Sequence, residues 1–275
     1  MTAQTELLRT ETKNGVRTLT MNNPRRLNGW TTAMRAALSK ALDAAAQDDA
    51  VGALVLTGTG KYYSAGADLS GGFRLAHPKT LRTMIVEGNY ELFDQFIRFS
   101  KPILAAVNGV ALGAPVTTAV LCDAIMASDI ASFSTPFARL GVPAEGCSSV
   151  LFPKLLGADV ADRILGAEGW KPTAQEALDI KLIDAVAPHE ALMAQAQQMA
   201  EAWVKEGRTR TYKGGLTRAQ LEEINARESE EVADAFLSAK FLMNQYRFLK
   251  SKKKTGPALT FLALTKTRPL WGRLL

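Results

Sequence analysis

Two short turns that contain glycine are the clearest places in this sequence where backbone N–H groups could stabilise negative charge. The first, Ser64 to Asp68, reads Ser-Ala-Gly-Ala-Asp, and the second, Asn108 to Pro115, reads Asn-Gly-Val-Ala-Leu-Gly-Ala-Pro. The second turn leads into an apolar stretch that can form a helix, and Pro115 suits its first position. The donor at this helix start must then be Gly113 or Ala114. Two N–H groups converging on one oxygen would form an oxyanion hole, although either turn alone is also an ordinary connection.

One carboxylate lies in a segment with unusual chemistry, Leu140 to Ser149. Glu145 is followed there by glycine and then by Cys147, Ser148 and Ser149. Glycine after the carboxylate leaves room for a substrate chain, so Glu145 could act as a base. Glu145 could equally cap a helix whose first turn holds Cys147 to Ser149. The residues themselves leave both interpretations open.

Several reaction classes lack the residues that they need. His77 and His189 are the only histidines, and each stands beside a proline in an expected loop, so a Ser-His-Asp triad or a histidine metal site is hard to build. Gly58 to Lys61 lacks the spacing of a phosphate-binding loop, and Gly109 to Gly113 lacks that of a dinucleotide fingerprint. Cys147 has no histidine nearby to activate it, so we expect it to line the pocket and not to act as a nucleophile. We therefore expect no metal, nicotinamide or NTP chemistry.

The elements that must position these turns alternate between strands and helices in the first half of the chain. The apolar pattern predicts four short strands and one helix, which begins after Thr31 and buries Met34, Leu38, Leu42 and Ala45. The strands are expected at 16–21, 53–56, 103–107 and 125–127. Short apolar strands separated by helices favour a parallel sheet with both faces buried.

The second half of the chain is expected to be helical. The pattern predicts helices over 190–206 and 217–250, and a last segment over 257–264. We place a boundary near residue 200, between an α/β core over 1–200 and a helical region over 201–275. An apolar stripe of Val232, Phe236, Leu237, Phe241 and Leu242 predicts that this region is an oligomer interface.

Composition narrows the protein class without identifying it. The chain has 275 residues, 47% of them hydrophobic, and a formal net charge of +6. Two cysteines cannot form a disulfide framework, so Cys122 and Cys147 are expected to be reduced and buried. We expect a cytoplasmic protein, because no signal-peptide pattern, membrane span or terminal peroxisomal address is recognised. A peroxisomal location stays open if the source is eukaryotic.

Both turns resemble the oxyanion segments of the crotonase (enoyl-CoA hydratase/isomerase) superfamily, and other segments match in the same order. Residues 23–29 are similar to the family's early loop. Residues 122–129 and 133–136 are similar to its central strand region, and residues 266–271 to its closing segment. The resemblance spans nearly the whole chain. It implies an α/β fold, a crotonase-type spiral of strand–strand–helix turns with a C-terminal helical region, assembled as a trimer or a dimer of trimers.

The resemblance also implies the site residues. Ala67 and Ala114 would donate N–H groups to a thioester carbonyl, and the Pro-Ala-Glu-Gly-Cys-Ser-Ser segment is similar to that of peroxisomal-type Δ3,Δ2-enoyl-CoA isomerases, where the glutamate is the base. Hydratases carry two glutamates at places that match Thr117 and Phe137 here. The other substrate-binding residues would be Ser64, Ala65, Gly66, Asp68, Leu69, Arg26, Leu27 and Gly113.

These matches predict an isomerase of fatty-acid β-oxidation that moves the double bond of a 3-enoyl-CoA to the 2-position, with Glu145 as the single base. Coenzyme A is part of the substrate, and no separate cofactor is expected. Its phosphates offer a use for Arg25, Arg26 and the basic run from Arg247 to Lys254. The alternatives are a hydratase, dienoyl-CoA isomerase or thioester hydrolase of the same fold, an RNA-binding crotonase-like protein, and a catalytically inactive scaffold. Neither nucleic acid nor a membrane is the expected partner.

Overall fold

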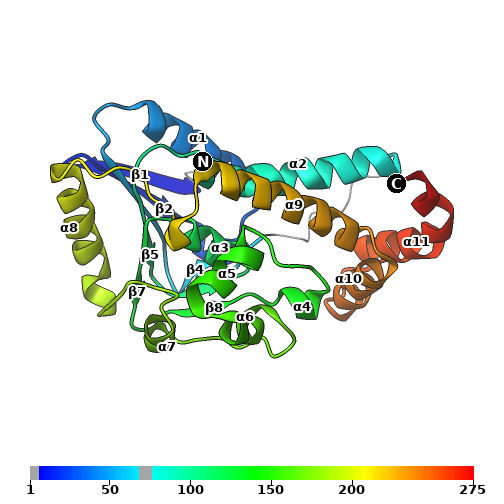
Figure 1. The fold of residues 1–275 in the computed structure, drawn as a ribbon. Helices are drawn as coiled ribbons and strands as arrows, with labels where there is room; N and C mark the ends of the chain where they lie inside the picture. Colours follow the sequence, from blue (N-terminus) through cyan, green and yellow to red (C-terminus); the bar gives the residue numbers. More distant parts are fainter. Residues whose placement is uncertain (1–5, 68–75) are drawn as a thin grey trace, which may run out of the picture.

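The computed structural model describes residues 6–67 and 76–275 of the chain (Figure 1). The strands are β1 Leu8–Lys13, β2 Val16–Met21, β3 Ala53–Gly58, β4 Tyr62–Ser64, β5 Ile103–Val107, β6 Val110–Leu112, β7 Ala124–Ser128, β8 Ser132–Ser134 and β9 Ala185–Ala187. The helices are α1 Thr32–Gln47, α2 Pro78–Ile97, α3 Ala114–Val120, α4 Phe137–Leu140, α5 Ser148–Leu156, α6 Ala158–Leu165, α7 Ala174–Asp179, α8 Leu192–Lys205, α9 Arg218–Phe236, α10 Ala239–Ser251 and α11 Thr255–Trp271. Short 3₁₀ turns include η1 Pro24–Arg26 and η3 His189–Ala191.

The main sheet has six strands in the order β1-β2-β3-β5-β7-β9, and every pair is parallel except β1 with β2. Its central strands are buried on both faces, which explains their unbroken apolar runs. Alternate residues of β3 show this plainly. Ala53 and Val55 face the cluster under α8, while Leu54 and Leu56 face the larger core.

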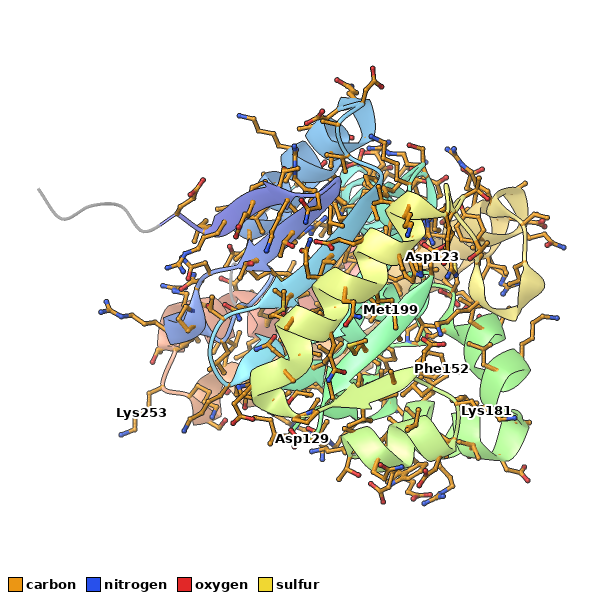
Figure 2. The ribbon with its side chains drawn as sticks, turned by 90° about the vertical axis from the view of Figure 1, so that its left-hand side faces the viewer. Asp123, Asp129, Phe152, Lys181, Met199 and Lys253 are labelled. Carbon is orange, nitrogen blue, oxygen red and sulfur yellow. The ribbon has the colours of Figure 1, made fainter. Side chains whose placement is uncertain are left out.

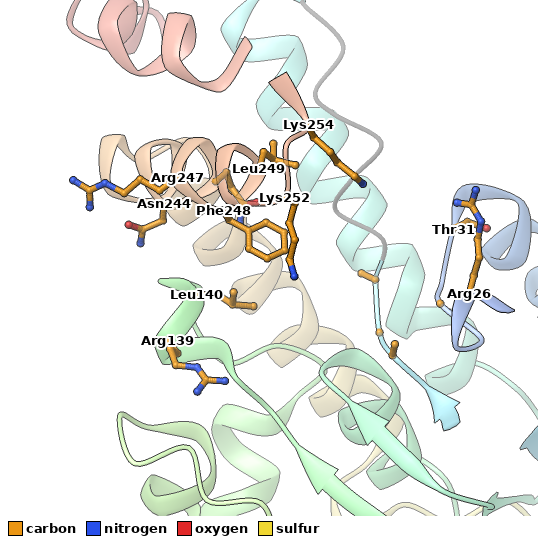
Figure 3. Close-up of a pocket in the computed structure, with 15 residues that line it drawn as sticks. Arg26, Thr31, Arg139, Leu140, Asn244, Arg247, Phe248, Leu249, Lys252 and Lys254 are labelled. Carbon is orange, nitrogen blue, oxygen red and sulfur yellow. The ribbon is translucent and has the colours of Figure 1, made fainter. Parts of the chain in front are cut away.

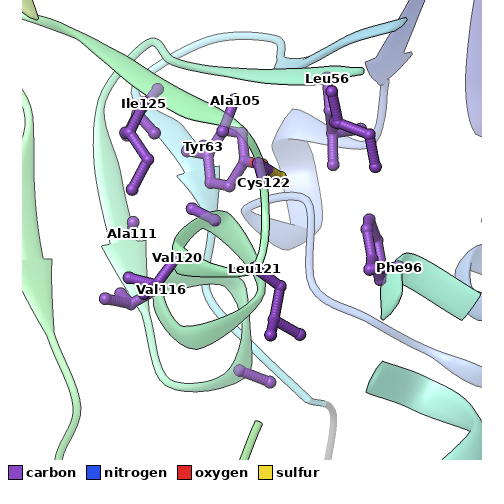
Figure 4. Packing of buried hydrophobic residues seen from close by; sticks show 14 of the residues in the cluster. Leu56, Tyr63, Phe96, Ala105, Ala111, Val116, Val120, Leu121, Cys122 and Ile125 are labelled. Atoms are coloured by element: carbon purple, nitrogen blue, oxygen red, sulfur yellow. The ribbon is translucent and has the colours of Figure 1, made fainter. Parts of the chain in front are cut away.

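Helix α8 covers one face of this sheet, as Figure 2 shows, where the helix that carries Met199 crosses the strands. Its Leu192, Ala196, Ala200 and Trp203 pack against alternate residues of the strands beneath. The other face holds the larger core, part of which surrounds α3 in Figure 4. Each strand is thus held between two apolar layers.

A second, three-stranded sheet positions the two turns. Its order is β4-β6-β8, and both pairs are parallel. The register places Ser64 beside Ala111. The carboxyl ends of β4 and β6 therefore meet at one edge, so the turns that follow them are neighbours. Strand followed by strand followed by helix recurs along the chain, as in β5-β6-α3.

The C-terminal helices extend away from the sheets at the end of the molecule opposite α8, while α9 lies along α2 (Figure 1). The prediction of one helix over 217–250 is wrong, because Ser238 accepts a hydrogen bond from the Phe241 N–H and starts a new helix there. The last segment is longer than predicted, since α11 runs to Trp271. The domain boundary near residue 200 stays a prediction.

The apolar stripe predicted as an oligomer interface is buried within the chain. Val232, Leu237, Phe241 and Leu242 are each at most 2% exposed, because α9, α10 and α11 pack on one another and on the core. The exposed apolar side chains of this region are others, namely Phe248, Leu259, Leu270, Leu274 and Leu275. The sequence pattern identified apolar helix faces correctly but could not say which element covers them.

The strand and helix predictions of the first half are otherwise confirmed. β2, β5 and α1 have the predicted bounds, Thr31 caps α1, and the four predicted apolar residues of α1 are buried. β1 was missed. The first turn follows a three-residue strand, β4, and the second turn contains another, β6. Helix α3 begins at Ala114, so Pro115 is its second residue. Both cysteines are free and buried, as predicted.

Candidate active site

Two backbone segments meet where β4 and β6 end. Gly66, after β4, has φ +83°, and a Cβ added there would lie 2.6 Å from the carbonyl oxygen of Leu112. Only glycine fits such an approach in that conformation. Below the turn, the Ser64 hydroxyl donates to the carbonyl of Asn28 at 2.7 Å and accepts from the Gly66 N–H at 3.2 Å. The turn is therefore held in place from beneath.

Ala67 and Ala114 are the residues whose N–H groups remain available at this junction. Ala114 is the first residue of α3, with Gly113 (φ +65°) as its N-cap, so its N–H has no acceptor within the helix. Among the described residues, neither N–H group has a hydrogen-bond partner. The carbonyl of Gly66, in contrast, accepts from the Trp30 N–H at 2.8 Å. The early loop that precedes α1 thus fixes the first turn in front of the second.

Glu145 faces the same space from the loop between α4 and α5. It lines a cavity of about 350 Å³ together with Ala67, Gly113 and Ala114. Gly146, which follows it, has φ +68°, and a Cβ there would lie 2.6 Å from both a ring carbon of Phe93 and Oγ1 of Thr117. The loop must pass this close to α2 and α3 to bring the carboxylate to the two N–H groups.

The cavity around Glu145 is mostly apolar, although Thr32, Arg35 and Asn89 also line it. Among the described residues that line it, Glu145 is the only carboxylate. Phe137 is buried and lines the cavity, whereas Thr117 lies behind it and donates its hydroxyl hydrogen to the Ala114 carbonyl at 3.1 Å. The remaining wall is formed by side chains such as Trp30, Ile85, Leu92, Val142 and Phe236. A single carboxylate therefore faces a mostly apolar space with two N–H donors.

The pKa of Glu145 is changed by its burial and by two charged neighbours. Burial, and to a smaller extent the nearby carboxylate of Glu228, raise the pKa of Glu145 to about 8 against the lowering effect of the Arg35 guanidinium. Arg35 lies on α1, lines the cavity and donates to the Gly88 carbonyl at 2.6 Å. A carboxylate whose pKa is raised is a stronger base once it is ionised.

A larger groove of about 1040 Å³ adjoins the cavity and shares Ala65, Gly66, Ala67 and Leu140 with it. Figure 3 shows its cationic side chains arriving from separate elements. These side chains are Arg26, Arg139, Arg247, Lys252 and Lys254. No acidic side chain lines the groove among the described residues. It can therefore hold an extended polyanion next to the apolar cavity.

Comparison with known proteins gives the family. A profile of the family described as "Enoyl-CoA hydratase/isomerase" matches residues 11–258. The chain belongs to this family. A crystal structure of an enoyl-CoA hydratase/isomerase from Pseudoalteromonas atlantica T6c shares the fold with a TM-score of 0.76 and 27% identity, and the match covers 90% of this chain and 98% of that one. The crotonase-type α/β fold predicted from the sequence is confirmed.

Relatives of this crotonase fall in more than one branch. Human enoyl-CoA delta isomerase 2 is 34% identical over 258 residues, which cover 90% of this chain and 64% of that protein. The 2,3-dehydroadipyl-CoA hydratase of Escherichia coli (strain K12) is also 34% identical, over 66% of this chain and 69% of that protein. The chain spans less than two thirds of the human isomerase, and its match covers 55% of mouse peroxisomal enoyl-CoA delta isomerase 3.

The structure brings most of the predicted site residues of this crotonase together. Ala65, Gly66, Ala67, Gly113, Ala114 and Glu145 line the cavity, and Arg26 lines the groove. Ser64 is fully buried and supports the turn from beneath instead of lining either space. Leu27 is 41% exposed and lines neither, although its carbonyl accepts from the Ala65 N–H. Asp68 and Leu69 lie outside the described residues.

Other predicted roles at this site change. Cys147 does not line the cavity; its thiol is buried and donates to the carbonyl of Leu221 at 3.3 Å. Burial and the nearby Glu228 both raise the pKa of this thiol. The group that caps α5 is Glu228, not Glu145. Arg35 and Glu228 were missed, because their relation to Glu145 depends on how distant helices pack.

Two further features are absent from the described residues. They hold no cluster of three or more histidine, cysteine, aspartate or glutamate side chains that could bind a metal ion. No helix among them is long and apolar enough to cross a membrane.

Proposed function

We propose that this crotonase converts 3-enoyl-CoA thioesters into 2-enoyl-CoA thioesters. The observation that carries the proposal is that Glu145, the one carboxylate among the described residues of this mostly apolar cavity, faces the N–H groups of Ala67 and Ala114. Neither N–H group has a hydrogen-bond partner in the described part of the chain. Addition of water benefits from an acid and a base, whereas a double-bond shift can use one group twice. Similarity to human enoyl-CoA delta isomerase 2 supports the same choice.

In this mechanism the thioester carbonyl accepts hydrogen bonds from Ala67 and Ala114. Ionised Glu145 takes a proton from C2, and the electron pair moves into a dienolate whose oxygen the two N–H groups stabilise. Glu145 then returns the proton to C4, which gives the conjugated thioester with no net change in charge or redox state. Loss of one such donor in other enzymes costs ~2.7–4 kcal/mol of transition-state stabilisation.

The basic groove is the proposed site of the coenzyme A moiety. Arg26, Arg139, Arg247, Lys252 and Lys254 line it, so its charge suits the phosphates of the coenzyme. The groove opens beside Ala67, and the acyl chain would extend from there into the apolar cavity. Coenzyme A enters as part of the substrate, and the proposed reaction uses no further cofactor.

The test measures both reactions on the purified protein and follows the transferred hydrogen. We expect isomerisation of 3-hexenoyl-CoA to exceed hydration of crotonyl-CoA, because Thr117 and Phe137 supply no second carboxylate. With substrate deuterated at C2, one base predicts that part of the deuterium appears at C4. The proposal would be overturned if hydration were as fast as isomerisation or faster. It would also be overturned if no deuterium were transferred and Glu145→Gln kept full activity.

We also propose that the protein assembles in threes. The exposed apolar side chains Phe248, Leu259 and Leu270 on α10 and α11 would be covered in such an assembly. Light scattering at micromolar concentration should give a multiple of three chains. A monomer mass would contradict it.

A further inference from the structure

A second buried carboxylate lies behind Glu145 and has no part in the proposed proton transfer. Glu228, on α9, has a relative exposure of 0%. Its Oε2 accepts from the Cys147 N–H at 2.6 Å and its Oε1 from the Ser149 N–H at 2.9 Å. A buried carboxylate without such partners would be strongly destabilising, so these two bonds explain how it is tolerated.

The two N–H groups belong to the segment that carries Glu145. Gly146 and Cys147 both have left-handed backbone conformations, with φ +68° and +63°, and α5 begins at Ser148. A left-handed conformation is unfavourable for cysteine, so outside contacts must hold it. The Ser148 hydroxyl donates to the Glu145 carbonyl at 2.8 Å, which ties α5 directly to the base. By gripping the start of α5, Glu228 fixes the backbone from which Glu145 projects.

Glu228 also contributes negative charge behind the base. The charged groups around the two carboxylates are Arg35 on α1, with Glu91 of α2 beside it, and Arg227 on α9. Arg227 acts on Glu228 and is turned toward the Ser149 hydroxyl, which it meets at 3.4 Å. Arg35 acts on Glu145 from the cavity side. The base therefore lies between a cation in front and a carboxylate behind.

We propose that Glu228 is a positioning residue for Glu145, which holds the catalytic loop through the start of α5 and strengthens the base by its negative charge. This inference rests on the proposed function for its effect on turnover. The effect on Glu145 itself does not depend on which reaction the site performs.

The experiment compares Glu228→Gln with Glu231→Gln as its matched control. Gln keeps the shape of Glu228 but removes its charge and one of its acceptor atoms. Glu231 lies on the same helix, is exposed and is 3.8 Å from Arg227, so its replacement removes the same charge from α9 without touching α5. Carboxyl ¹³C NMR of labelled glutamate follows the titration of Glu145, assigned with Glu145→Gln, and kinetics gives kcat and KM against pH.

In wild type the two carboxylates should titrate as a coupled pair, so the Glu145 signal should show two inflections. In Glu228→Gln we expect one inflection, moved to lower pH by roughly one unit because a like charge is gone. The acid limb of kcat/KM should move with it, and kcat should fall roughly tenfold because the base is weaker and less well placed. KM should be unchanged. Glu231→Gln should match wild type in every measurement.

If Glu228→Gln only lowers the melting temperature and leaves both the Glu145 titration and the acid limb of kcat/KM unchanged, the role of Glu228 is purely structural and the inference is overturned. Should Glu228→Gln not fold, Glu228→Asp keeps the charge and should retain the acid limb while losing kcat. A single inflection for Glu145 in wild type would also overturn it. If wild type shows no isomerase activity yet the Glu145 signal shifts as expected, the proposed function fails and the positioning role stands.

Discussion

Replacing Glu145 by glutamine should stabilise the folded protein at alkaline pH while removing its activity. Burial raises the pKa of Glu145 from its ordinary 4.5 to about 8. Ionising Glu145 in the folded chain therefore costs roughly 4–5 kcal/mol more than in the unfolded chain, at about 1.36 kcal/mol per pKa unit. Glutamine has the same shape and never ionises, so the mutant avoids this penalty.

The sign of the pH dependence follows from proton binding. Because the folded-state pKa is raised, the folded chain keeps a proton on Glu145 that the unfolded chain has already released between about pH 4.5 and about pH 8. Stability from this group is thus complete below that window and is lost as the pH rises through it. Between about pH 5.5 and about pH 8.5, wild type should lose roughly 3 kcal/mol of unfolding free energy relative to Glu145→Gln.

Urea denaturation of both proteins at the two pH values measures this difference, since titration of other groups largely cancels between them. Glu231→Gln serves again as the exposed control and should follow wild type. In the same preparations, Glu145→Gln should lower isomerase turnover by roughly 10²–10⁴, the usual contribution of a positioned base. Parallel loss of stability in wild type and Glu145→Gln would show that Glu145 titrates as an ordinary surface carboxylate, and the argument from its burial would fail.

Substitutions at three other positions test separate parts of the structure. Ala114→Pro removes the N–H at the start of α3, which has no acceptor among the described residues, and should abolish turnover in a protein that still folds by circular dichroism. Ala114→Gly keeps this N–H and should be mild. Full activity of the proline variant would rule out Ala114 as a donor. Gly146→Ala should lower kcat and should destabilise the fold by about 1–3 kcal/mol in urea denaturation, because the added Cβ would lie 2.6 Å from Phe93 and Thr117. An unchanged kcat would mean that the loop can shift freely. Asp123 forms an ion pair with Arg210, and both side chains are buried. Asp123→Asn should cost about 3–5 kcal/mol in the same assay, because it leaves the Arg210 guanidinium without its charged partner; a loss under 1 kcal/mol would contradict this.

Several parts of this fold whose pattern is local were predicted from the sequence. α1 is an example, since its apolar spacing and its Thr31 cap are both contained in the segment. The strands of the parallel sheet were predicted because burial on both faces leaves continuous apolar runs. The three-residue strands β4 and β6 were missed, because a strand of that length carries no periodicity and forms only when its partners are adjacent.

The site divides in the same way. The glycine turns can be recognised in the sequence, because at Gly66 and Gly146 a Cβ atom would clash with neighbouring atoms and only glycine fits. Arg35 and Glu228 carry none, since an arginine or a glutamate on an amphipathic helix looks like a solvated surface residue. Only the packing of α1 and α9 around the cavity reveals that Arg35 faces it and that Glu228 is buried. The stripe on α9 and α10 failed as an interface prediction for a related reason, because its cover is another part of the same chain.

The contact between Glu228 and α5 has a consequence for the order in which the protein matures during synthesis. Cys147 and Glu228 are 81 positions apart, so the loop with Glu145 leaves the ribosome long before the carboxylate that caps α5. All strands of both sheets precede α9 in the chain and can pair first. A nascent chain can thus become compact while the loop that carries Glu145 is not yet held by Glu228. Enzymatic turnover, and not compactness, then reports that the C-terminal helices have docked.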